Sequence, residues 1–265
     1  METPRGQRNL FGKALRLLRW MLESSNEGWG VRELAHQLSL PPSTVHRVLT
    51  LLEQEGLVEN RSRPGQYHIG LELYRMMLLA QAQFVIRNVA LPSMRDLVAE
   101  CDETSFLGVY DSSRLEMMFA AAVDSSKPLR YVVPLNEWIP VYCASSGMAI
   151  MAFLPQEEIE RIIEHTGLVP VTEHSITDPV ALRAELARIR AQGYSCSHGQ
   201  RVPGAVGIAV PIFGPEGRVV GDLNLTIPEQ RFDASMEPRL AGRVMHHAHR
   251  ISERLGTRMP IQNQS

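Results

Sequence analysis

Three amphipathic patterns follow one another in the first part of the chain. Apolar residues recur at intervals of three and four in Asn9–Ser24 and again in Val31–Leu38. A third such stretch starts after Pro41-Pro42 and ends near Glu55-Gly56. Two adjacent prolines are tolerated in the first turn of a helix but not in its interior. The sequence therefore predicts three helices that must pack together, the third beginning at the prolines.

Two short β-prone runs follow the third helix. Leu57–Glu59 and Tyr67–Gly70 flank a segment that contains Pro64-Gly65, a strong turn former. This arrangement predicts a β-hairpin. Three helices with a tight turn before the third, followed by a hairpin, are typical of a winged helix-turn-helix, which we expect to span residues 1–70.

The third helix has a polar side away from its apolar stripe. Its short polar groups and its arginine suit the base edges in the DNA major groove. Residues 1–20 hold five cations against one anion, which favours contact with DNA phosphates. Cations at the hairpin tip are placed to reach either the DNA backbone or the minor groove. The candidate DNA-binding residues are Ser43, Thr44, His46, Arg47 and Thr50 on the helix, Arg61 and Arg63 at the hairpin tip, and Arg8 near the chain start.

The charge of the whole chain is nearly balanced. With 27 Lys+Arg against 29 Asp+Glu, the net charge of −2 excludes a protein that coats nucleic acid along its whole length, and 44% hydrophobic residues exclude a charged, disordered chain. Three cysteines without a CxxC pair do not make a disulfide framework, and no apolar stretch approaches a membrane span. We expect a soluble, cytoplasmic protein with no membrane partner.

Short motifs in both halves of the chain carry a family resemblance. They are Leu34-Ala35, Leu40-Pro41, Ser43–Leu49, Leu52–Val58 and Tyr67–Gly70 in the first part, and Ala144–Phe153, Ile189–Tyr194 and Gly207–Phe213 in the second. With these motifs in this order, the sequence resembles the IclR family of bacterial transcriptional regulators. The resemblance covers nearly the whole chain.

The resemblance implies an α+β protein with a division of labour. A winged helix-turn-helix (residues 1–70) is expected to join, through a linker helix (71–87), an effector-binding domain (88–265) that is similar to the GAF fold. Family members bind operators in double-stranded DNA as homodimers, or as homotetramers built from dimers. The resemblance thus implies a sequence-specific transcriptional regulator, not an enzyme, whose DNA binding a small-molecule effector modulates.

The second part of the chain also predicts an antiparallel α+β domain on its own residues. Thr104–Tyr110 with Leu115–Val123, and Ala205–Phe213 with Arg218–Ile227, are two pairs of β-prone runs, each pair flanking a turn. Helical patterns lie between and after these pairs, among them Asp178–Gln192, which starts at a capping aspartate. Antiparallel strands with helices at their ends and faces define an α+β domain.

The resemblance also implies where the effector binds. In the family, the effector contacts a helix start at a small-residue glycine motif, a position shortly after Gly-Tyr, and positions on the strands that follow. Asn224 and Thr226 are two residues apart, so both point to the same face of a strand. Backbone N–H groups at Ser145 and Ser146, which we expect just before a helix, are placed to hold a carboxylate. The effector-binding positions in this sequence are Ser145, Ser146, Ser197, Gly207, Asn224 and Thr226.

At four of these positions the chain departs from the members that bind small oxo-acids. Those members carry an acidic residue, a cysteine and two serines where this chain has Ser197, Gly207, Asn224 and Thr226. Because glycine leaves more room, our hypothesis is a larger organic acid, an aromatic one, as the effector. The residues expected to line the enlarged pocket are Tyr131, Tyr142, Cys143 and Met148.

Two other functions stand as alternatives. One is an enzyme in the C-terminal domain with a DNA-binding anchor, and the other is a winged helix that binds a protein. The sequence has no GxSxG elbow, P-loop or Rossmann fingerprint, so no cofactor is expected. No metal site is expected either, because a solvated or interface histidine face and buried, inert thiols explain the remaining candidates. Those candidates are His246, His247 and His249, and Cys143, Cys196 and His198.

Overall fold

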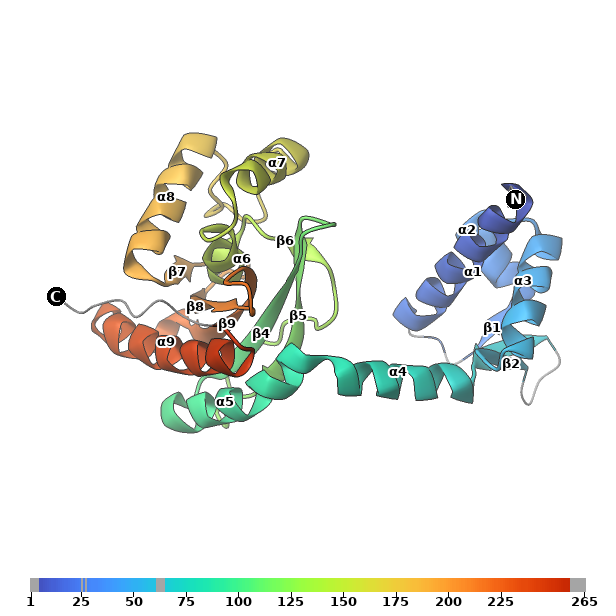
Figure 1. Ribbon diagram of the computed structural model, residues 1–265, viewed down its shortest axis with the longest axis horizontal. Coiled ribbons are helices and arrows are strands. Elements are labelled where there is room, and N and C mark those ends of the chain that lie inside the picture. Colours follow the sequence, from blue (N-terminus) through green and yellow to red (C-terminus); the bar gives the residue numbers. More distant parts are fainter. Residues whose placement is uncertain (1–4, 25, 27, 61–64, 258–265) are drawn as a thin grey trace. The chain divides into compact units, whose positions relative to one another are not determined.

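The chain divides into two units, Met1–Phe84 and Val85–Ser265 (Figure 1). The structure is a computed structural model that describes residues 5–24, 26, 28–60 and 65–257, without the side chains of residues 5–9. Helices and antiparallel sheets occur in both units, which confirms the predicted α+β class.

The first unit is a winged helix-turn-helix. Ser39 adopts a left-handed conformation (φ 51°) and ends the second helix, and Pro42 begins the third, with Pro41 as its N-cap. The apolar stripes of the helices meet in one core that includes Leu17, Leu34 and Leu49. Its elements are α1 (Arg5–Glu23), β1 (Trp29–Gly30), α2 (Val31–Leu38), α3 (Pro42–Gln54), β2 (Val58–Asn60), β3 (Gln66–Ile69) and α4 (Leu71–Gln83).

The wing contains the predicted hairpin and one additional strand. β2 pairs antiparallel with β3, with Val58 opposite Ile69. β1 pairs with the other edge of β3, with Trp29 opposite Tyr67. Both aromatic side chains are buried, so their packing, and not the strand propensity of a two-residue segment, holds β1 in the sheet.

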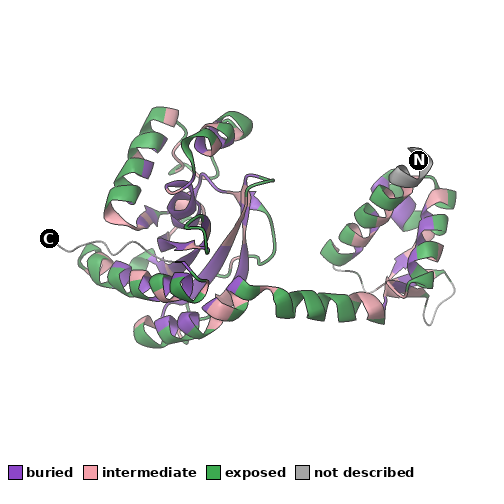
Figure 2. Cartoon of the chain, in the orientation of Figure 1, coloured by how far each residue is buried: buried purple, intermediate pink, exposed green. Residues whose placement is uncertain are grey.

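The second unit is built on one antiparallel sheet with strand order β6-β5-β4-β9-β8-β7. Helices cover both faces: α5 and α9 lie on one side, and α6, α7 and α8 on the other (Figure 1). The strands are mostly buried between these two layers (Figure 2). The elements are α5 (Val85–Cys101), β4 (Thr104–Asp111), β5 (Glu116–Val123), β6 (Ile139–Pro140), α6 (Ala144–Met151), α7 (Gln156–Thr166), α8 (Pro179–Gln192), β7 (Ser195–His198), β8 (Ala205–Phe213), β9 (Val219–Pro228), two short 3₁₀ turns, η1 (Glu229–Arg231) and η2 (Ala234–Met236), and α9 (Glu237–Arg254).

The β8–β9 hairpin places two kinds of side chain on opposite faces of the sheet. Because side chains alternate along a strand, Leu223, Leu225 and Ile227 share one face, and residues 222, 224 and 226 share the other. Leu223, Leu225 and Ile227 are fully buried and belong to the layer that α5 and α9 cover. The polar set therefore faces α6, which starts directly above it.

The helical core of the first unit gives a direct stability test. We expect Leu49→Ala to lower the free energy of unfolding of this unit by about 2–5 kcal/mol, because Leu49 is 0% exposed and its removal leaves a cavity. The matched control is Leu51→Ala on the same helix, where the side chain is 44% exposed and a cost below about 1 kcal/mol is expected. Native-state hydrogen exchange of α3 amides measures both. Equal costs would contradict the assigned face of α3.

Candidate functional site

The polar side of α3 faces solvent, as a recognition helix requires. Ser43, His46 and Arg47 are exposed, and Thr44 and Thr50 are half-buried beside the apolar stripe. The Thr50 hydroxyl donates to the His46 carbonyl oxygen (3.0 Å), which holds this side chain along the helix surface. The exposed set thus leaves an arginine, an imidazole and hydroxyls available to a duplex.

The side chains of three other candidate DNA-binding residues are not among those that the structure describes. Arg8 belongs to α1, but its side chain is not among those described, and Arg61 and Arg63 lie outside the described residues. Their contacts with DNA stay predictions.

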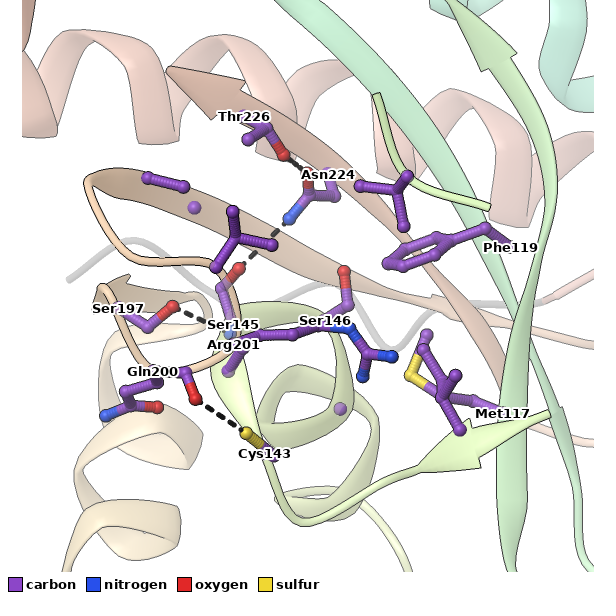
Figure 3. Close-up of a pocket in the computed structure, with 17 residues that line it drawn as sticks. Met117, Phe119, Cys143, Ser145, Ser146, Ser197, Gln200, Arg201, Asn224 and Thr226 are labelled. Carbon is purple, nitrogen blue, oxygen red and sulfur yellow. Dashed lines mark hydrogen bonds between the residues drawn. The ribbon is translucent and has the colours of Figure 1, made fainter. Parts of the chain in front are cut away.

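A pocket opens in the second unit where α6 meets β8, β9 and the segment that follows β7 (Figure 3). It contains about 480 Å³ of unfilled space, its open mouth included. Most of the predicted effector-binding residues come together here, from four separate stretches of sequence. Those that line it are Cys143, Ser145, Ser146, Ser197, Gly207, Asn224 and Thr226.

Hydrogen bonds tie the start of α6 to the sheet. The Thr226 hydroxyl donates to Asn224 Oδ1 (2.8 Å), and Asn224 Nδ2 donates to Ser145 Oγ (3.0 Å). The Ser145 backbone N–H donates to Ser197 Oγ (2.9 Å). These bonds confirm that Asn224 and Thr226 share a strand face, as their spacing predicts.

The serines occupy a different place from the one expected. Ser145 and Ser146 lie inside the first turn of α6, not before it, because Ala144 takes a left-handed conformation (φ 60°) and turns the chain directly into the helix. The Ser145 N–H is already bonded to Ser197, so it is not free to hold a carboxylate. The contact of the Ser146 N–H with a carboxylate stays a prediction.

Gly207 lies against the Ser145 side chain. A Cβ at position 207 would come within 2.2 Å of Ser145 Oγ and 3.2 Å of Ser145 Cβ. The space that glycine leaves is therefore occupied by Ser145, which corrects the expectation that Gly207 enlarges the ligand space. Glycine is instead what allows α6 to approach the sheet closely enough for the Asn224–Ser145 bond.

Three aromatic or sulfur-containing residues expected in the pocket lie elsewhere. The Tyr131 hydroxyl donates to the Pro203 carbonyl oxygen (3.1 Å), and that of Tyr142 to Val169 (2.7 Å). Met148 is buried in the core beneath α6. None of the three is among the lining residues.

Sequence reasoning missed the residues that give the pocket its charge and its apolar wall. Arg201 is the one charged residue among those that line it. No sequence motif or periodic pattern predicted Arg201 as a pocket residue. Its loop comes next to the pocket only when the whole domain is folded. The apolar lining residues that were missed are Met117, Phe119, Val133, Ile139, Ala144, Val202 and Ala205.

Asp222 is a buried carboxyl group on the same strand face as Asn224. It is fully buried. Burial raises the pKa of Asp222 to about 7, and hydrogen bonding from the Ser146 hydroxyl opposes that rise. Asp222 approaches Gly108 so closely that a Cβ there would meet its Oδ1, so this strand pair admits the carboxyl only opposite a glycine.

The histidine and cysteine candidates are dispersed. Across the described part of the chain, no group of three or more His, Cys, Asp or Glu residues is arranged to hold a metal ion. His247 is buried beside Glu100 (Nε2 to Oε1, 3.3 Å). Burial raises the pKa of Cys143 and that of Cys196, which disfavours reactive thiolates. Among the described helices, none is long and apolar enough to cross a membrane.

A winged helix-turn-helix with an exposed polar recognition helix, followed by an α+β domain with a small-molecule pocket, defines the class of DNA-binding transcriptional regulators. Sequence profiles agree with this class. The profile "Bacterial transcriptional regulator IclR C-terminal" matches residues 80–253, and "IclR helix-turn-helix domain" matches residues 12–62. The chain belongs to the IclR family, as its motifs predict.

Individual relatives span nearly the whole chain. The HTH-type transcriptional regulator Rv1719 of Mycobacterium tuberculosis is 32% identical over 247 residues, with 92% of this chain and 91% of the relative covered. The transcriptional repressor IclR of Escherichia coli is 29% identical and covers 85% of this chain and 82% of its own. The solved structure of an IclR homologue from Microbacterium hydrocarbonoxydans, complexed with 4-hydroxybenzoate, has a TM-score of 0.80 and 26% identity over 93% of this chain and 98% of that one.

The close contact at Gly207 can be tested by a compensating pair of substitutions. We expect Gly207→Ala to lower the free energy of unfolding of the second unit by about 1–3 kcal/mol, because the new methyl group displaces Ser145 and breaks its bond with Asn224. In a Ser145→Ala background the same substitution should cost less, since Oγ is gone. Chemical unfolding followed by hydrogen exchange of β8 and β9 amides measures the cycle. Equal costs in both backgrounds would show that Ser145 is not the obstacle.

The buried carboxyl group predicts a pH dependence of stability. The folded-state pKa of Asp222, about 7, lies above the unfolded value near 3.9, so between these values the native state binds the extra proton. The contribution of this group to stability therefore falls as pH rises through that window, with a slope approaching ~1.4 kcal/mol per pH unit.

Asp222→Asn should remove that slope, because an amide does not titrate. The measurement is the difference in unfolding free energy between variant and wild type from pH 5 to pH 8, which should shift in favour of the variant as pH rises. Asp124→Asn, at a side chain 58% exposed, is the control and should show no such trend. A difference that stays constant with pH would contradict the raised pKa.

Proposed function

We propose that this chain is a repressor whose operator binding is modulated by a small organic acid that occupies the pocket of the second unit. The observation that carries the proposal is the pairing, in one chain, of an exposed recognition helix with a pocket lined by hydrogen-bonded serine and asparagine side chains. Several relatives are named repressors, among them those of Escherichia coli and Salmonella typhimurium, which supports repression. Relatives named as regulators also support a role other than catalysis.

The ligand class that we propose is an aromatic acid. The pocket combines polar side chains on the α6 side with apolar Met117, Phe119 and Ile139, which suits a flat apolar body that carries polar ends. A homologue of similar fold was solved with 4-hydroxybenzoate, a molecule of this class.

The proposed DNA contacts follow the geometry of helix-turn-helix proteins. Side chains on α3 read base edges in the major groove, while Arg8, Arg61 and Arg63 contact phosphates. The α3 residues assigned to this role are Ser43, Thr44, His46, Arg47 and Thr50.

We also propose that the protein acts in the cytoplasm as a homodimer, or as a tetramer built from dimers. Helix-turn-helix proteins read two half-sites of a palindrome with two copies. α4 has no buried residue and exposes apolar side chains, including Leu71, Tyr74 and Leu78, which a second copy would cover.

DNA recognition by α3 can be tested with a charge-matched pair of variants. Arg47→Ala should weaken binding to a specific genomic fragment by about 1–3 kcal/mol, because Arg47 is exposed on the recognition helix and can bind a guanine edge through two bonds. Arg218→Ala removes the same charge from a side chain 85% exposed in the second unit and should leave affinity unchanged.

The fragment is obtained by selecting bound pieces of the source genome with the purified protein, and affinity is measured by gel-shift titration at fixed salt. Adding 4-hydroxybenzoate to the same titration tests the modulation. If Arg47→Ala binds as tightly as Arg218→Ala, the assigned reading helix is wrong. Consumption of the acid by the protein would favour an enzyme in the second unit.

A further inference from the structure

We propose that Arg201 selects an anionic ligand by binding its carboxylate, while Ser145, Ser146 and Ser197 donate hydrogen bonds to a second oxygen of the same molecule. The inference rests on the proposed ligand-binding role of the pocket. It narrows the ligand class to carboxylic acids with an apolar body and a second oxygen that can accept a hydrogen bond. Hydroxy- and oxo-substituted aryl acids are examples.

Arg201 is a cation without a direct ion pair in a largely apolar wall. Its side chain is half-buried and lines the pocket, and it makes no ion pair with a carboxylate of the described residues. Desolvation has the largest effect on the pKa of Arg201 and lowers it, while the charges of Cys143 and Glu137 act in the opposite direction. A desolvated charge without a partner costs free energy, and a bound carboxylate supplies the partner with two parallel N–H···O bonds.

The direction of the hydrogen bonds leaves hydroxyl hydrogens without acceptors. Thr226 donates to Asn224, and Asn224 donates to Ser145, so Ser145 Oγ receives a bond and keeps its own hydrogen to give. Ser197 Oγ likewise receives the Ser145 N–H and keeps its hydrogen. No acceptor for either hydrogen occurs among the described residues. These two hydroxyl groups are therefore able to donate to a ligand oxygen.

Ser146 is a third hydroxyl group beside the pocket. Its side chain is 4% exposed and lines the pocket, and its hydroxyl is close enough to the buried Asp222 to lower the pKa of that carboxyl group by hydrogen bonding. A ligand oxygen in the pocket would offer the Ser146 hydroxyl an alternative acceptor. Ser145, Ser146 and Ser197 thus line the same pocket with hydroxyl groups that can donate to a ligand.

Apolar residues complete the pocket on the side toward which Arg201 extends. In Figure 3 the Arg201 side chain extends toward Met117, and Phe119 lies on the same side. The Gln200 amide points away from the cavity, so its unpaired oxygen does not supply an acceptor there (Figure 3). A ligand with a carboxylate for Arg201 and a further oxygen for the serines would place its apolar part against Met117 and Phe119.

The experiment compares an acid with its uncharged analogue on the full-length chain. Calorimetric titrations use 4-hydroxybenzoate, 4-hydroxybenzamide, which lacks the charge, and benzoate, which lacks the second oxygen. Arg201→Met should weaken binding of 4-hydroxybenzoate by about 10- to 100-fold and leave binding of the amide unchanged, because only the acid pairs with the guanidinium. Ser146→Ala should weaken binding of 4-hydroxybenzoate by about 2- to 10-fold and leave binding of benzoate unchanged.

Two further variants separate recognition from folding. Arg201→Lys should keep part of the acid preference, and Arg218→Met, which removes an exposed cation, should bind every probe as the wild type does. Without ligand, Arg201→Met should melt at or above the wild-type temperature, because an unpaired, desolvated cation is lost. A lower melting temperature would assign Arg201 a structural role and overturn the proposal.

Failure of this inference is distinguishable from failure of the proposed function. If the acid binds wild type and Arg201→Met equally, or if Arg201→Met weakens acid and amide alike, the carboxylate role of Arg201 is rejected while ligand control of DNA binding stands. If neither acid binds wild type at millimolar concentration, the ligand class is rejected. If the acid binds as expected but leaves DNA affinity unchanged, the selectivity role stands and the proposed modulation fails.

Discussion

The hydrogen bond from Asn224 to Ser145 joins the first turn of α6 to the middle of the sheet, and the pocket depends on it. The bond requires the helix to come within side-chain reach of β9, which in turn requires glycine at position 207 on the adjacent strand. A single amide, a hydroxyl and a missing Cβ therefore set the distance between two layers of the domain.

The same strand face carries groups that weaken the fold. Asp222 is a fully buried carboxyl group, and the buried Ser146 hydroxyl next to it only partly offsets the effect of that burial on its pKa. Buried polar groups in this state cost stability, and they concentrate where α6 covers the sheet. The opposite face of β9, with Leu223, Leu225 and Ile227, has the close apolar packing that offsets such a cost. The domain thus separates a stabilising face from a face suited to binding.

Much of the architecture follows from local patterns. The Pro41-Pro42 pair marks the start of α3 because proline fits only the first helical turn, and Asp178 caps α8 by accepting the Ala181 N–H (2.8 Å). The turn at residues 214–217 joins β8 to β9 as predicted. Short edge strands were missed: β1, β6 and β7 have no alternating pattern of their own, and pairing with β3, β5 and β8 holds them extended.

The sequence by itself determined the helices, the main hairpins, the family and the polar face of α3, because periodicity and turn chemistry act over a few neighbouring residues. It also determined that Asn224 and Thr226 share a face, since side chains alternate along a strand. Only the tertiary structure decided that Arg201 lines the pocket and that Tyr131 does not. The loop that contains Arg201 lies beside the start of α6 only because the whole domain packs together. No short-range sequence pattern predicts such a contact.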